Sequence, residues 1–304
     1  MRFSPFGFAR KITGVLLRKQ STFKSAVAGV SAFGFALFSS FAPVMAAGDG
    51  SVATAATPAP NTPQSADQIS ATKADIDNPV ILYFHGLGGN SAEPYCLPGG
   101  KRGLVFTAFK ANSKNVDFKG FDYDYTKVVN GDYNDLKNAV EGYIRGENVT
   151  TKRVILVGTS MGGYTALGLY TKLSPDIKKL ISGAIVLICP ENLETLLKKT
   201  KSPDVLNALK PYGETLKNYT LAKLFDKSEL PAVPEVVVFV RLHDDLVVPI
   251  ACNQRIVPII KSHGALVREI GIEGKHGVPA QLNYEIAYQH YKQLVRQKDG
   301  TLAK

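Results

Sequence analysis

The feature that most constrains the fold of this chain is the alternation of short apolar runs with segments of helical periodicity. Continuous β-branched or aliphatic runs predict strands at residues 80–84, 153–157, 183–189, 235–240 and 265–270, with a weaker strand within 115–124. Apolar residues at helical spacing predict helices over 132–144, 161–173, 249–261 and 281–296. This alternation is typical of an α/β domain whose mostly parallel sheet is covered on both faces. We therefore predict an α/β domain with about six strands over residues 79–304.

One segment of the domain interrupts the alternation. Residues 191–228 are rich in Lys and Leu and contain Pro203 and Pro211. The segment predicts a small helical insertion between two strands.

The first 47 residues have the order of a secretory signal peptide: a basic region, an apolar region and small residues at the end. The apolar stretch runs over 26–41 and is followed by Pro43, Val44 and Ala46, so we expect cleavage after Ala46 or Ala47. The interpretation places the mature protein in the periplasm or outside the cell. The alternative is an uncleaved anchor in the inner membrane, since the apolar run is about long enough to span. The Gly, Ser and Ala content and the Pro43 break favour cleavage.

Residues 48–78 are rich in Ala, Thr, Pro, Ser, Asn and Gln and are interpreted as a disordered linker.

The charge and composition of the chain argue against nucleic-acid binding. The formal net charge of +10 includes six basic residues within 1–47, a segment without acidic residues, so the remainder carries only +4. No run of basic residues interleaved with aromatics is visible, and we therefore expect no nucleic-acid partner.

The strongest motif is Gly158-Thr159-Ser160-Met161-Gly162, which directly follows an apolar strand and precedes a helix. It matches the G-x-S-x-G nucleophile elbow, in which the serine is held in a strained turn at the end of a strand. The two glycines are expected where a Cβ would collide with the turn. Ser160 is the candidate nucleophile, and a plain helix cap at this serine is the alternative.

A serine nucleophile needs a base, and the base needs an orienting carboxylate. Among the five histidines, His276 lies in a glycine-flanked loop between the last strand and the last helix, which favours it as the base. The carboxylate candidates follow two earlier strands: Asp245 is preferred, Asp244 is its neighbour, and Glu191 is the weakest.

From about residue 79 to the end, these features resemble the α/β-hydrolase family. Ser160, Asp245 and His276 occur in the family's chain order of nucleophile, acid and base. The resemblance also implies that the turn at 85–89 supplies one oxyanion-hole amide, so that the N–H groups of Leu87 and Met161 hold the oxyanion. We expect His85 to support this turn and not to belong to the triad. The family's initial antiparallel strands have no room here, which predicts a shortened version of the fold.

The remaining features give weaker expectations. Cys189 ends an apolar strand and is expected to be buried and inert, and a disulfide between Cys96 and Cys252 is a hypothesis. No Cys/His spacing is typical of a zinc site, and the glycines at 86–89 lack the Lys-Ser/Thr sequence of a phosphate loop. We expect neither a metal nor an organic cofactor.

Together these features predict an exported serine hydrolase that cleaves a small-molecule or lipid-like ester, as a carboxylesterase or lipase does. Peptidase, thioesterase and polyester depolymerase activities stay open, because the fold hosts all of them. The alternative from another class is a catalytically silent binding protein that keeps the fold. The sequence does not fix the oligomeric state, and no stable membrane anchor is expected once the signal is cleaved.

Overall fold

The computed structural model describes residues 75–97, 101–146, 149, 152–274, 276 and 281–301. The predicted signal peptide and most of the predicted linker lie outside these residues. Within them, no helix combines the length and the apolar character that crossing a membrane requires.

A six-stranded parallel sheet forms the centre of the domain, as the alternation predicted. Its strand order is β4-β1-β5-β6-β7-β8, and every neighbouring pair is parallel. The strands are β1 (Asp75–Phe84), β4 (Asp117–Phe121), β5 (Lys152–Thr159), β6 (Ile181–Leu187), β7 (Val236–Leu242) and β8 (Leu266–Ile272). The central strands each contain a continuous buried apolar run, at 80–84, 154–157, 184–187 and 236–240, because helices bury both of their faces.

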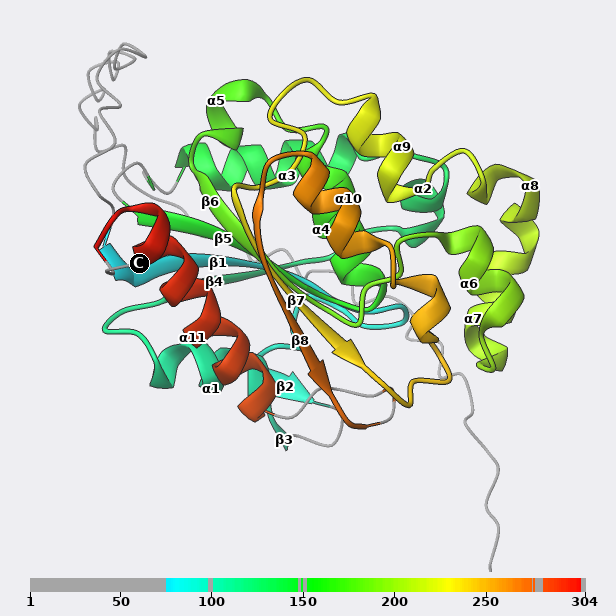
Figure 1. The fold of residues 1–304 in the computed structure, drawn as a ribbon, viewed down its shortest axis with the longest axis horizontal. Helices are drawn as coiled ribbons and strands as arrows, with labels where there is room; N and C mark the ends of the chain where they lie inside the picture. The colour runs from blue at the N-terminus through cyan, green and yellow to red at the C-terminus, as the bar shows by residue number, and fades with distance from the viewer. Residues whose placement is uncertain are drawn as a thin grey trace, which may run out of the picture. The chain divides into compact units, whose positions relative to one another are not determined.

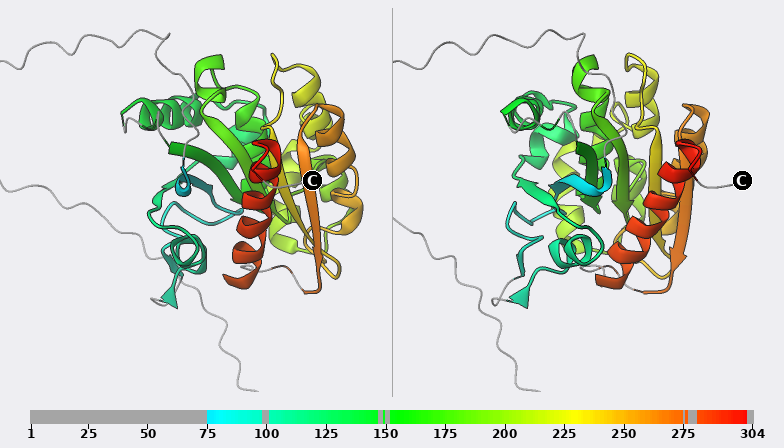
Figure 2. Two further views of the ribbon diagram at one scale, coloured as in Figure 1. Left: turned by 60° about the vertical axis from the view of Figure 1, so that its left-hand side comes forward. Right: turned by 90° about the vertical axis from the view of Figure 1, so that its left-hand side faces the viewer.

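Helices cover the two faces of this sheet (Figures 1 and 2). On one face, α1 (Leu104–Ala111) lies beside the C-terminal helix α11 (Gln281–Lys298). The other face carries α3 (Asn134–Gly146), α4 (Met161–Tyr170), α9 (Leu221–Asp226) and α10 (Ile256–Ser262). Short helices α2 (Tyr125–Val129) and α5 (Pro175–Lys178) complete this side.

The segment after β6 forms the small helical insertion that was predicted. It contains α6 (Leu193–Lys199), α7 (Pro203–Leu209), the 3-10 turn η3 (Lys210–Tyr212), α8 (Gly213–Leu216) and α9. The side chains of Asn192, Ser202 and Thr220 cap α6, α7 and α9 by accepting hydrogen bonds from amides of their first turns. Each of these short helices buries leucine side chains, which attaches the insertion to the domain.

The structure differs from the predicted elements in three places. β1 begins at Asp75, so the last four residues of the predicted linker belong to a strand that pairs with β5. The helix predicted over 249–261 is divided into a 3-10 turn, η4 (Ile250–Cys252), and α10, because the backbone turns at Asn253. Helices α1, α2 and α5 and the hairpin of β2 (Cys96–Leu97) and β3 (Lys101–Arg102) were not predicted, since they are too short to show a clear period.

Candidate active site

Ser160 lies at the turn between β5 and α4, at the carboxyl end of a central strand. Its backbone has φ 55° and ψ −122°, a conformation that non-glycine residues rarely adopt. The Ser160 N–H donates to the carbonyl of Leu187 at the end of β6, at 2.8 Å. The strained turn predicted from the motif is therefore present, and it is held by the neighbouring strand.

The two glycines of the motif are required by the packing of the turn. A Cβ built on Gly158 would lie 2.3 Å from the carbonyl oxygen of Gly162, and a Cβ on Gly162 would lie 2.0 Å from that of Phe84. Both contacts are with backbone atoms, in α4 and in β1, which cannot move aside without disturbing these elements. The predicted collision is confirmed at both positions.

The turn that follows β1 lies against this elbow. A Cβ on Gly86 would lie 3.8 Å from Ser160 Cβ and 3.6 Å from the carbonyl oxygen of Thr159. Leu87 follows Gly86, and Met161 follows Ser160 as the first residue of α4, where an N–H has no acceptor within the helix. Across the described part of the chain, neither the Leu87 nor the Met161 amide donates a hydrogen bond.

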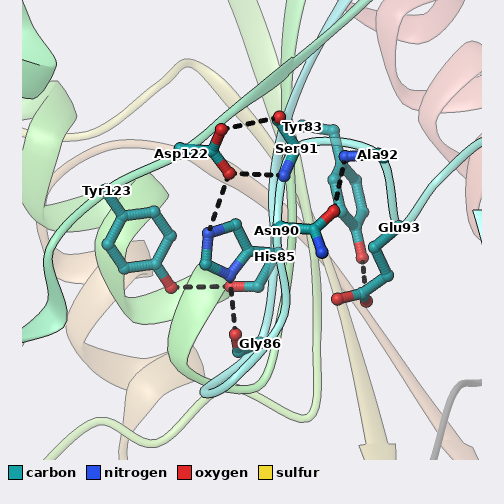
Figure 3. A network of polar contacts seen from close by, with 9 residues as sticks. All are labelled: Tyr83, His85, Gly86, Asn90, Ser91, Ala92, Glu93, Asp122 and Tyr123. Atoms are coloured by element: carbon teal, nitrogen blue, oxygen red, sulfur yellow. Dashed lines mark hydrogen bonds and ion pairs between the residues drawn. The ribbon is translucent and has the colours of Figure 1, made fainter. Parts of the chain in front are cut away.

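His85 supports this turn through the contacts drawn in Figure 3. Its Nδ1 lies 2.7 Å from the carbonyl oxygen of Gly86, and since a carbonyl only accepts, Nδ1 is the donor. Its ring stacks on Tyr123 with centroids 4.5 Å apart, and the Tyr123 hydroxyl donates to the His85 carbonyl at 2.6 Å. His85 is only 6% exposed, and these contacts hold the turn in place.

A carboxylate ties the same loop to the end of β4. The side chain of Asp122 accepts hydrogen bonds from the Ser91 amide at 2.6 Å and the Ser91 hydroxyl at 2.8 Å (Figure 3). These two bonds hold the pKa of the Asp122 carboxyl below its ordinary value. Asp122 Oδ1 also lies 4.0 Å from His85 Nε2. Nothing in the sequence marked Ser91, Asp122 or Tyr123, because they meet only when β4 pairs with β1.

Asp245 and His276 form a hydrogen-bonded pair beyond the ends of β7 and β8. Asp245 Oδ2 lies 2.7 Å from His276 Nδ1. A carboxylate oxygen accepts, so Nδ1 carries the hydrogen and Nε2 is left with its lone pair. Asp245 Oδ1 accepts from the amides of Val247 at 2.8 Å and Val248 at 3.0 Å.

The surroundings of Asp245 favour its charged form. The side chain is buried, which raises the pKa of the carboxyl, but the hydrogen bond and charge of His276 and the two amides together hold it below its ordinary value. The neighbouring Asp244 side chain is exposed. Glu191, the third candidate acid, is buried. Its backbone N–H donates to the Cys252 carbonyl and its carbonyl accepts from the Leu221 N–H, so these bonds do not reach the histidine loop.

The parallel sheet brings these residues to one edge. Ser160, Asp245 and His276 follow the carboxyl ends of β5, β7 and β8, which point the same way (Figure 1). The Ser160 hydroxyl makes no hydrogen bond to any residue that the structure describes. Catalytic hydrogen bonds of this kind are often long until substrate is bound.

A second strained residue, missed by the sequence reasoning, lies beside the elbow. Ile188 has φ 57°, which is an outlier for a β-branched residue. Its N–H donates to the Val240 carbonyl at 2.8 Å, next to the bond from Ser160 to Leu187. Two strained residues on neighbouring strand ends are typical of an active site.

The cysteines follow the predictions in part. Cys189 is buried, and burial raises the pKa of its thiol well above the ordinary value. Cys252 is a free, buried thiol, so the structure does not contain the hypothesised disulfide with Cys96, whose side chain lies outside the described atoms. Among the described residues, no cluster of three or more His, Cys, Asp or Glu side chains could hold a metal ion.

The comparisons with known proteins place this geometry in context. No family model matches the chain. The dipeptidyl aminopeptidase BIII of Pseudoxanthomonas mexicana is 31% identical over 141 residues, which cover 44% of this chain and only 20% of that protein. The chain therefore spans about a fifth of the length of this curated relative.

Two solved structures show the same fold. A puromycin-hydrolyzing peptidase of Mycobacterium tuberculosis superposes with a TM-score of 0.51 at 15% identity, over 69% of this chain and 32% of that one. An esterase of Pyrococcus furiosus superposes with a TM-score of 0.50 at 18% identity, over 73% of this chain and 84% of that one. The resemblance indicated by the motifs is thus confirmed for the architecture, and this chain has the α/β-hydrolase fold.

Proposed function

We propose that this protein is a serine hydrolase that acts through Ser160, His276 and Asp245. The observation that carries the proposal is the 2.7 Å hydrogen bond between Asp245 and His276 at the sheet edge that also bears the strained Ser160 turn. The buried carboxylate fixes the imidazole with its proton on Nδ1, so Nε2 keeps the lone pair with which it acts as the base. The two features come from separate loops, and their meeting at one edge supports a common role.

The reaction then proceeds through an acyl-enzyme. The Ser160 oxygen attacks the substrate carbonyl carbon as its proton passes to His276 Nε2, and the carbonyl oxygen becomes an oxyanion. The amides of Leu87 and Met161 donate to that oxyanion. The oxyanion then collapses, the bond between the carbonyl carbon and the leaving group breaks, and the imidazolium gives its proton to the leaving group. Water attacks the acyl-enzyme carbonyl carbon as His276 takes its proton, and the bond to the Ser160 oxygen breaks as that oxygen is reprotonated and the acid is released. No cofactor takes part in these steps.

The proposed substrate is a carboxylic ester, as in carboxylesterases and lipases. A peptidase is the second candidate, and the observation that favours it is the similarity of 141 residues to a dipeptidyl aminopeptidase. A thioester is a further substrate of the same chemistry. These substrates share the acyl-enzyme and differ in the leaving group.

A fluorophosphonate probe tests the nucleophile. Wild type should be labelled at one site, and Ser160→Ala should not be labelled and should lose at least about 10³-fold in kcat. The Ser202→Ala variant is the matched control, since Ser202 caps α7 in the insertion, and it should be labelled like wild type. A folded wild-type protein that resists the probe would mean that the chain is a silent binding protein.

A substrate panel separates the two classes. Chromogenic esters, thioesters and dipeptidyl anilides that carry the same acyl group should be compared by kcat/KM. The ester proposal expects the ester to exceed the anilide by more than their difference in intrinsic reactivity. A preference for the anilide with a free amino terminus would replace it with the peptidase.

We also propose that the protein is exported by its first 47 residues, on the basis of their sequence pattern. Cell fractionation and amino-terminal sequencing of the mature protein test this. A mature chain that begins near Ala47 or Gly48 is expected; an intact amino terminus in the membrane fraction would favour the anchor instead.

A further inference from the structure

A chain of buried hydroxyl groups lies beneath the candidate site, on the face of the sheet covered by α1 and α11. The hydroxyls of Thr159 and Tyr284 are 2.7 Å apart and buried. The Tyr83 hydroxyl donates to Glu93 Oε1 at 2.9 Å, and Tyr83 lies on β1, which pairs with β5, the strand that ends at Thr159. Tyr83 and Tyr284 are fully buried. Two hydrogen-bonded pairs therefore lie on adjacent strands, in a region where an unpaired hydroxyl would be costly.

The members of this chain adjoin the three segments that carry the proposed nucleophile, oxyanion amide and base. Thr159 directly precedes the nucleophile Ser160. Tyr83 lies on β1 two residues before His85, and Glu93 lies in the loop that follows the oxyanion turn (Figure 3). Tyr284 lies in the first turn of α11, eight residues after His276.

Glu93 also packs on the oxyanion turn itself. A Cβ on Gly89 would lie 2.1 Å from Glu93 Oε2 and 3.0 Å from His85 Cβ. Gly89 closes the turn by donating to the Gly86 carbonyl at 3.1 Å. The Glu93 end of the chain therefore touches the segment that carries the Leu87 amide.

The donors and acceptors of the chain have one consistent direction. A carboxylate only accepts, so Tyr83 donates its single proton to Glu93, and its oxygen stays available to Thr159, whose side chain opposes the rise in the Tyr83 pKa. With the Thr159 proton directed to Tyr83, Tyr284 is the donor in its bond with Thr159. Burial raises the pKa of the Tyr83 and Tyr284 hydroxyls, so both keep their protons at neutral pH. Such chains strengthen one another in a low-dielectric interior.

We propose that the chain Glu93–Tyr83–Thr159–Tyr284 is a positioning device that holds the oxyanion turn, the nucleophile and the start of the base-bearing helix in register. The inference rests on the proposed function. Its members touch no reacting atom and act through Leu87, Ser160 and His276. The same helix offers a comparison: Tyr291 is also fully buried and lies 2.6 Å from Ser182 Oγ, but Ser182 bonds to Val154 at the opposite end of the sheet.

The test uses isosteric removal of single hydroxyls. Thr159→Val and Tyr284→Phe should each lower kcat and the rate of fluorophosphonate labelling about 10- to 100-fold, with KM within about twofold, because a small misplacement of reacting groups has a large cost. The double variant should be no slower than about the slower single variant, as members of one network are not additive. Thr159→Ser keeps the hydroxyl and should label like wild type.

Tyr291→Phe is the matched control, since it removes a buried tyrosine hydroxyl from the same helix. It should lower Tm about as much as Tyr284→Phe and label within about twofold of wild type. Wild-type rates in Thr159→Val and Tyr284→Phe, with Tm lowered as in Tyr291→Phe, would mean that the hydroxyl chain contributes only to packing. This outcome would overturn the inference and leave the proposed function standing.

The remaining outcomes also decide. Losses that multiply in the double variant would show two independent hydroxyls and overturn the chain. A wild-type protein without labelling would overturn the proposed function, and the inference with it. If either single variant fails to fold, the other one, together with Thr159→Ser, decides by the same rates.

Discussion

Two carboxylates follow neighbouring strands of the sheet, and their surroundings give them opposite properties. Asp245 follows β7 and Glu191 follows β6, and both are buried. Asp245 accepts bonds from His276 and two amides, which hold its pKa below the ordinary value despite burial. Burial raises the pKa of Glu191, and the charge of Arg255 offsets this only in part.

The comparison shows that burial alone does not fit a carboxylate to orient a histidine. A buried carboxylate stays ionised only when donors replace its lost water. The loop after β7 supplies two such donors from its own backbone, the amides of Val247 and Val248, independently of His276. Across the described residues, no hydrogen bond to the Glu191 carboxylate is found. Glu191 is therefore a poor replacement for Asp245.

The largest expected effect comes from neutralising Asp245. Asp245→Asn should lower kcat/KM by about 10³- to 10⁴-fold, because an amide stabilises neither the imidazolium nor the required tautomer. The exposed neighbour provides a control of equal charge: Asp244→Asn should stay within about twofold. Steady-state rates on the best ester of the panel measure both, and a larger loss in Asp244→Asn would assign the acid to that residue.

A smaller effect is expected on stability as a function of pH. Because the folded-state pKa of Asp245 lies below its unfolded value, its charge stabilises the fold above about pH 4, and this contribution is lost as the pH falls through the folded pKa. Asp245→Asn should therefore lower Tm by about 5 °C at pH 7 and by much less below pH 4. Thermal unfolding followed by circular dichroism measures this, and an equal change at both pH values would contradict it.

Neutralising Glu191 should change the thermal stability in the opposite sense to neutralising Asp245, and this is the smallest of the expected effects. The folded-state pKa of Glu191 is raised, so its ionisation costs stability as the pH rises through that value. Glu191→Gln should raise Tm by about 1–3 °C at pH 8 and leave it unchanged at pH 4, with kcat/KM within about threefold of wild type. A fall in Tm at pH 8 would mean that the Glu191 charge is stabilising, and the contrast with Asp245 would be lost.

Much of the fold could be predicted because the pattern of one strand or helix is local. The continuous apolar runs of β1, β5, β6 and β7 and the helical spacing of α3, α4 and α11 follow from burial on both sides of a sheet. Helices α1, α2 and α5 were missed because four to eight residues carry too little periodicity. β8 was predicted as a strand, although it is an edge strand whose residues are all exposed or half-buried.

The sequence by itself determined the elbow at Ser160. Gly158 and Gly162 specify a turn that no other residue fits, and both the strand before it and the helix after it are visible in the pattern. The alternation of strands and helices along the sequence also indicated a parallel sheet. Residues that follow β5, β7 and β8 were therefore expected together at the carboxyl ends of the strands, since all strands of a parallel sheet end on the same side.

Only the tertiary structure distinguished between the candidate partners. Asp244 and Asp245 are neighbours with the same chemistry, and the direction of the chain at the end of β7 buries one and exposes the other. The same holds for Glu93, Tyr83, Thr159 and Tyr284, which lie up to about 200 residues apart in a sequence that gives each of them an ordinary place. A hydrogen bond tolerates a change of only a few tenths of an ångström in the distance between donor and acceptor. Only the packing of helices and strands sets distances with that precision.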